Sequence, residues 1–172
     1  MPQAAPKILI LGVGNILYAD EGVGVRAVER LQAGYRFSGN VTLMDGGNLG
    51  MRLMGPLLET DRCIVLDAVL GGDVPGTIYR LTGDDLRKSL AFKDSMHQSD
   101  LVDTLISCEL IGHRPETVVI GMEPAQFQSM SIDLSPAIAA RLPAMCTLAL
   151  TELTSAGGRA TPHALPAEQP GA

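Results

Sequence analysis

The feature that most constrains the fold is a repeated alternation of apolar runs and helix-like segments. Residues 7–13 form a continuous apolar run, which is typical of a strand buried on both faces. Further strands are predicted at 41–44, 62–69, 77–81 and 117–122, and helices at 22–33, 48–59, 98–111 and 135–153. Alternating β and α units of this size predict an α/β fold. We expect a three-layer sandwich with a twisted, mostly parallel five-stranded sheet between helices.

Local signals refine these elements. Asn48 is a candidate N-cap, and Gly55-Pro56 predicts a bend or break in the helix that follows it. The link between strands 62–69 and 77–81 is too short for a crossover helix, so we expect those two strands to pair antiparallel. The third helix is expected to turn four apolar side chains inward: Leu101, Val102, Leu105 and Ile106.

Length and composition predict a single domain over residues 1–155 and a tail over 156–172. The tail is rich in Gly, Pro, Ala and polar residues, a composition that predicts disorder. A net charge of −6 disfavours nucleic acid or an anionic membrane as partner. No apolar run approaches the roughly 20 residues that span a bilayer, and the first residues lack the pattern of a signal peptide. We therefore expect a cytoplasmic protein.

The glycine-rich stretch GVGNILYADEGVG, residues 12–24, directly follows the first strand. Gly12 and Gly14 supply the first part of a dinucleotide fingerprint, but Leu17 occupies the third position. The adjacent acids Asp20 and Glu21 would repel a pyrophosphate at the start of the helix. The sequence therefore argues against a nucleotide cofactor, and the glycines are better explained by close backbone turns.

Three side chains are candidates for chemistry. Glu21 lies at a helix start, where an acid can simply complement the helix dipole. Asp67 ends a buried apolar strand, where a carboxylate is costly without a partner or a cation. His97, just before the third helix, would alone be interpreted as structural or exposed, and His113 and His163 are weaker candidates.

Taken together, Glu21, Asp67 and His97 fall at strand ends or strand-to-helix loops on the same predicted edge of the sheet. Two carboxylates and an imidazole suit a divalent transition ion with open coordination positions. A serine triad is unsupported because there is no GxSxG elbow. The three cysteines lie within predicted elements, which argues against a thiol nucleophile and suits core positions in a reducing compartment.

Four stretches in order, ILILGVGNILYADEGVG, VTLMDGGNLG, IVLDAV and MHQSDL, resemble the hydrogenase maturation endopeptidase family. These proteases trim the C-terminal extension of a nickel–iron hydrogenase large subunit. The resemblance runs from about residue 7 to about residue 153. It implies that Glu21, Asp67 and His97 contact metal and act in catalysis, and that Gly46 and Gly47 shape the groove for the extension.

The resemblance also implies how the site would be used. The nickel would be supplied by the substrate, and the partner would be the hydrogenase large-subunit precursor, bound by a monomer. Water would be activated either by the ion or by a carboxylate base, so the enzyme is of aspartic type or metal-assisted. The alternative from another class is a non-catalytic, nickel-sensing chaperone of the immature large subunit. Residues 82–96 match no motif of the family.

Overall fold

The computed structural model describes residues 4–47, 50–88 and 96–163, and within these ranges the side chains of 84, 87–88 and 96–100 lie outside the description. Its strands are β1 (Ile8–Val13), β2 (Tyr35–Phe37), β3 (Val41–Gly47), β4 (Arg62–Ala68), β5 (Ile78–Thr82), β6 (Glu116–Met122) and β7 (Ala160–Pro162). Its α-helices are α1 (Val23–Gly34), α2 (Met54–Leu58), α3 (Gly83–Lys88), α4 (Met96–Ile111) and α5 (Pro136–Ser155). Short 3-10 helices, η1 (Ala19–Gly22) and η2 (Gly50–Leu53), precede α1 and α2.

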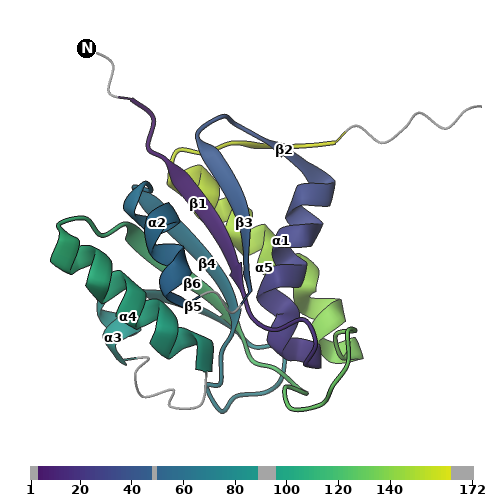
Figure 1. Ribbon diagram of the computed structural model, residues 1–172. Coiled ribbons are helices and arrows are strands. Elements are labelled where there is room, and N and C mark those ends of the chain that lie inside the picture. Colours follow the sequence, from purple (N-terminus) through teal and green to yellow (C-terminus); the bar gives the residue numbers. More distant parts are fainter. Residues whose placement is uncertain (1–3, 48–49, 89–95, 164–172) are drawn as a thin grey trace, which may run out of the picture.

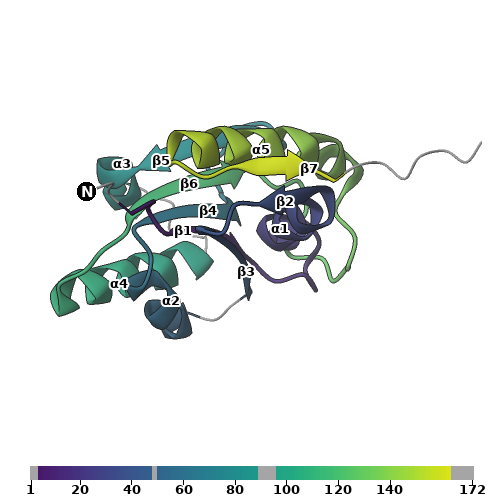
Figure 2. The ribbon, with the colours of Figure 1, turned by 90° about the horizontal axis from the view of Figure 1, so that it is seen from above.

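The main sheet has the strand order β3-β1-β4-β6-β5, as can be followed in Figure 1. β1 pairs in parallel with β3 and β4, and β4 pairs in parallel with β6. Helices α1 and α5 cover one face of the sheet, and α2 and α4 cover the other (Figure 2). The expected α/β sandwich with a mostly parallel five-stranded sheet is confirmed.

Two hydrophobic clusters hold the layers together, one on each face of the sheet. Alternate residues of β1 point to opposite faces: Ile8 and Ile10 pack with α1 and α5, whereas Leu9 and Leu11 pack with α2 and α4. The side chains on both faces of β1 are buried, which explains why the sequence of β1 is an unbroken apolar run. None of the helices in the described ranges is long and apolar enough to cross a membrane.

The pairing expected for residues 77–81 was wrong. β5 pairs antiparallel with β6, and β6 lies between β5 and β4. The short link does reverse the chain, so the direction of β5 relative to β4 was right and its neighbour was not. Both edges of β4 are occupied by parallel partners, β1 and β6, which leaves β5 to pair at the outer edge of β6. Loop length alone does not reveal such competition between strands.

The inward face of α4 also differs from the expectation. Leu101 and Leu105 are buried as predicted, but Val102 is half-buried and Ile106 is 45% exposed. Thr104 and Cys108 take the inward positions instead. Apolar residues are spread around the helix and not confined to one side, so hydrophobic spacing does not determine which side faces the sheet.

Two further segments depart from the sequence prediction. The chain after Leu53 begins α2 at Met54, before the predicted break at Gly55-Pro56, and Asn48 lies outside the described residues. Near the C-terminus, β7 pairs antiparallel with β2, so residues 160–162 form a strand where a tail was expected. Their composition is poor in apolar residues, and the pairing with β2 supplies the backbone hydrogen bonds.

Candidate functional site

The site lies where β1 and β4 end side by side at the centre of the sheet. The chain leaves β1 toward β3 and returns to β4 on the other side of β1, so the two connections diverge at this point. In parallel α/β sheets, such a switch point at the carboxyl ends of the strands is the usual place of a binding crevice. The loop after β1 carries Glu21, and β4 carries Asp67 at its carboxyl end.

Two glycines bring the start of α1 against these strand ends. A Cβ on Gly14 would overlap the carbonyl oxygen of Glu21, and Gly14 has a φ of 131°, which L side chains rarely adopt. A Cβ on Gly24 would overlap the carbonyl oxygen of Leu66, the residue before Asp67. The glycines therefore serve close backbone approach, and that approach places Glu21 beside Asp67.

The two carboxylates interact electrostatically. Asp67 is 1% exposed and accepts a hydrogen bond from the Ala68 N–H at 2.8 Å. Burial raises the pKa of Asp67 well above its ordinary value, and the charge of the half-buried Glu21 raises it further. The hydrogen bond from Ala68 opposes this shift but does not cancel it. A carboxyl group that holds its proton so strongly is suited to proton transfer or to capture of a cation.

His97 lies in the first turn of α4, which starts at the same end of the sheet as α1 (Figure 1). Its side chain is outside the described part of the structure. Among the side chains that are described, no three histidine, cysteine, aspartate or glutamate residues are grouped to hold a metal ion. The structure thus brings together two members of the predicted trio, Glu21 and Asp67, and the role of the third stays a prediction.

Asp20 has a different role from its neighbour Glu21. It is fully buried, and its Oδ2 accepts hydrogen bonds from the N–H groups of Ala125 and Gln126 at 3.0 and 2.7 Å. The Ser135 N–H donates to Oδ1 at 2.7 Å, and the Ser135 hydroxyl donates to Oδ2 at 2.8 Å. This carboxylate therefore ties the loop that carries Glu21 to the loop between β6 and α5. Residue type and position alone do not distinguish the two adjacent acids, and only the family resemblance singled out Glu21.

Glu123, which had no predicted role, supports the other side of the site. It directly follows β6, is buried, and accepts hydrogen bonds from the Gly71 N–H and the Tyr79 hydroxyl, each at 2.7 Å. It thereby holds the turn that follows Asp67 in the chain. Burial, and then hydrogen bonds to Glu123 and Asp73, raise the pKa of Tyr79. The signal that could have found Glu123 is the one that found Asp67: an acid that ends a buried apolar strand.

The Asp45-Gly46-Gly47 turn lies at the end of β3. A Cβ on Gly46 would lie 2.7 Å from a terminal side-chain carbon of Leu11 and 3.1 Å from the Gly12 carbonyl oxygen, so a larger residue would require Leu11 to shift. Gly47 has a φ of 45°, and its N–H donates to the Asp45 carboxylate at 2.9 Å. Packing thus accounts for Gly46, and a contact of either glycine with substrate stays a prediction.

All three cysteines, Cys63, Cys108 and Cys146, are free and buried, as the sequence predicted. Burial raises the pKa of Cys63 to about 12 and that of Cys146 to about 11. Because the thiolate is the reactive form, these thiols are poor nucleophiles. They serve as small apolar core residues.

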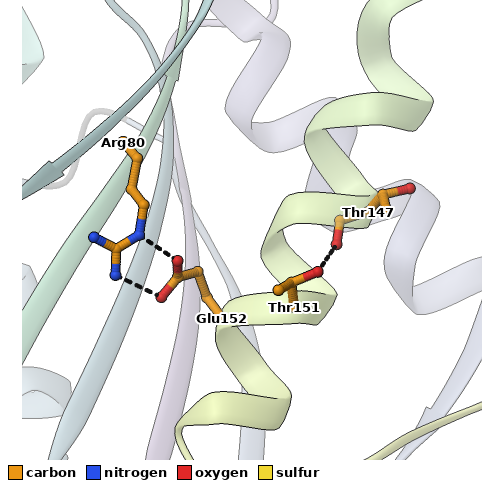
Figure 3. Close-up of polar contacts among 4 residues, drawn as sticks. All are labelled: Arg80, Thr147, Thr151 and Glu152. Carbon is orange, nitrogen blue, oxygen red and sulfur yellow. Dashed lines mark hydrogen bonds and ion pairs between the residues drawn. The ribbon is translucent and has the colours of Figure 1, made fainter.

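Two cavities are lined by neither Glu21 nor Asp67. One of about 780 Å³ is lined by Arg62 and Glu116 at the amino ends of β4 and β6, opposite the site. Its border includes the pair of Arg80 on β5 and Glu152 on α5, in which two guanidinium nitrogens donate to both carboxylate oxygens (Figure 3). The other, of about 1180 Å³, lies between α1 and α5. The chemistry of Asp67 and Glu21, not cavity size, identifies the site.

A buried acid beside a second carboxylate at the switch point of an α/β sheet is a candidate catalytic site. The structure has a TM-score of 0.86 with the hydrogenase maturating endopeptidase HybD from Escherichia coli, at 34% identity over 91% of this chain and 97% of that one. The Hydrogenase 2 maturation protease of Escherichia coli K12 is 34% identical over 91% of this chain and 96% of its own. The hydrogenase expression/formation protein HupD of Rhizobium leguminosarum is 40% identical to this chain, over 91% of this chain and 78% of its own length.

The model of the hydrogenase maturation protease family matches residues 25–152. The chain belongs to the hydrogenase maturation protease family and is an endopeptidase of that family. The family resemblance that the sequence motifs indicated is confirmed. The matched range includes Asp67 and the start of α4, and Glu21 lies just before it.

Proposed function

We propose that this protein removes the C-terminal extension of a nickel-loaded nickel–iron hydrogenase large-subunit precursor, in the cytoplasm and as a monomer. The observation that carries the proposal is the pairing of Glu21 with the buried Asp67 at the carboxyl ends of β1 and β4. His97, in the adjacent first turn of α4, would complete an O,O,N set. The ion would arrive with the substrate.

The raised pKa of Asp67 supports the proposal that the ion arrives with the substrate. Without a cation, burial and the charge of Glu21 favour the protonated carboxyl group. A divalent ion held by substrate cysteines would stabilise the ionised form, so Asp67 would release its proton as it binds the ion. Only a precursor that already carries nickel would supply that charge. The acid pair would therefore discriminate between loaded and empty precursors.

Two routes to hydrolysis fit these residues. The carboxylates can position the substrate's ion, which polarises the scissile carbonyl or activates water. Alternatively, Glu21 or Asp67 acts as the general base toward water. Glu21→Gln separates the routes. A ligand role predicts weaker docking with cleavage retained at high substrate concentration, whereas a base role predicts normal docking and lost turnover.

The test is cleavage of the nickel-loaded precursor, followed by mass spectrometry. Asp67→Asn and His97→Gln should each slow cleavage by about 100-fold or more, the usual contribution of a positioned acid or base. The matched control is Glu109→Gln, because Glu109 pairs with Arg114 at 2.9 Å near the other end of α4. Near-normal rates in both site variants would refute the assignment. A stable complex with no mass shift would instead indicate the chaperone.

A further inference from the structure

Three exposed apolar side chains lie on the loop that leads to Glu21 and on the loop that is hydrogen-bonded to it. Leu17 is 52% exposed, Met130 is 78% exposed and Ile132 is 64% exposed. We call these three residues the rim patch. They come from two loops, one between β1 and η1 and the other between β6 and α5. Exposed apolar side chains gathered on one surface are characteristic of a binding site for another molecule.

The backbone of these loops is held in place. The Ser131 N–H donates to the Leu17 carbonyl at 3.0 Å, the Ala19 N–H donates to the Ser131 carbonyl at 2.8 Å, and Tyr18 and Ser131 form a parallel β-bridge. Leu17 lies in a turn, and the hydrogen bond from the Ser131 N–H to its carbonyl brings the backbone of Met130 next to it. The backbone beneath the rim patch is therefore preorganised, so binding would not have to order these loops.

Two charged side chains of η1 and α1, Asp20 and Arg26, are already engaged in hydrogen bonds. The guanidinium of Arg26 donates to the Ile132 carbonyl at 2.8 Å and to the Glu29 carboxylate at 2.9 Å. The buried Asp20 accepts its four hydrogen bonds from the loop between β6 and α5, including Ser135 just before α5. What the rim patch offers a ligand is thus apolar contact.

The rim patch is continuous with the acid pair. The Glu21 N–H donates to the Tyr18 carbonyl at 3.0 Å, so the backbone that presents Leu17 also positions Glu21. An endopeptidase must hold its substrate on either side of the bond it cuts, and an extended chain advances about 3.3 Å per residue. A polypeptide that crosses Glu21 and Asp67 therefore brings its neighbouring residues over these loops. On the other side of the acid pair lies the turn after β4, which Glu123 holds through the Gly71 N–H.

We propose that the rim patch binds apolar side chains of the precursor polypeptide next to the scissile bond. This inference rests on the proposed function. It assigns Leu17, Met130 and Ile132 to substrate affinity, independently of the nickel that docks at the acids. Specificity would then have two sources: the substrate's ion, and an apolar segment of its chain.

The test uses the full-length protein and the nickel-loaded precursor. Met130→Glu should raise KM by about tenfold or more and leave kcat within about twofold, because it removes one buried apolar contact and adds a charge. The matched control is Leu110→Glu, since Leu110 is 83% exposed near the far end of α4. It should change neither constant. An unchanged KM for Met130→Glu would overturn the proposal.

Binding is measured separately, by titrating each variant with the precursor. If the wild-type protein binds without cleaving, the proposed function fails while the affinity of Met130→Glu still tests the rim patch. In that case too, the inference would be overturned if Met130→Glu bound the precursor as tightly as the wild-type protein does. Sedimentation of the same variants tests whether a second copy of this chain, and not the precursor, covers the rim patch. A change of oligomeric state in Met130→Glu would show that a second copy of this chain covers the rim patch, and would also overturn the proposal.

Discussion

Asp20→Ala removes the buried carboxylate that joins the site loop to the loop between β6 and α5. Four donors lose their acceptor: the N–H groups of Ala125, Gln126 and Ser135, and the Ser135 hydroxyl. Ala125 and Gln126 are exposed, so water can replace the acceptor for their N–H groups. Ser135 is buried, and its two donors would be left unpaired.

Each buried donor left unpaired costs about 1–3 kcal/mol. Removing the carboxylate also removes its own desolvation cost, which offsets part of this loss. We therefore expect Asp20→Ala to lower the free energy of unfolding by about 2–4 kcal/mol. Asp20→Asn keeps one carbonyl oxygen, which can accept the three donors that now reach Oδ2. Its amide nitrogen then faces the Ser135 N–H, and we expect a loss of about 1–2 kcal/mol.

The assay is urea unfolding, with the midpoint lowered and the slope unchanged. Asp133→Asn is the matched control because Asp133 is an exposed acid in the loop between β6 and α5, to which Asp20 is bonded. This substitution should change the free energy of unfolding by less than about 0.5 kcal/mol. A loss under about 1 kcal/mol for Asp20→Ala would refute the reasoning, because a carboxylate that organises two loops cannot be that dispensable.

Burial raises the folded-state pKa of Asp67, so wild-type stability falls as pH rises from the unfolded pKa, about 3.9, toward the folded value. Metal-free Asp67→Asn should melt higher than wild type at pH 7 but not below the unfolded pKa, and a pH-independent difference would contradict this. Gly14→Ala should displace the Glu21 backbone and impair both stability and cleavage. Gly39→Ala, which adds a methyl group in open space, should impair neither. Cys63 should react with a thiol reagent only after unfolding in urea, and rapid labelling of the native protein would exclude its burial.

Much of the fold could be predicted from local pattern. The apolar run of β1, the helical spacing of α1 and the turn before β5 each reflect a few adjacent residues, because side-chain period and turn chemistry are local properties. The predicted antiparallel pair failed for a different reason. The neighbour of β5 depends on which strand edges remain free, and that depends on the whole sheet.

The site shows the same division. An acid at the end of a buried strand identifies Asp67 from sequence because its burial demands a partner. The adjacent acids Asp20 and Glu21 are equivalent by residue type and position, yet one accepts hydrogen bonds inside the protein and the other interacts with Asp67. Which way each points depends on the turn of η1 and on the loop that packs against it.

The sequence by itself determined the class of fold, the position of the first strand and its glycine loop, and the family, because these are recorded in spacing and residue type. Only the tertiary structure decided the order of the strands, the buried role of Asp20, the support that Glu123 gives to the turn after Asp67, and the gathering of Leu17 with Met130. Each of these depends on contacts between residues far apart in the chain, and such contacts form only when the layers pack.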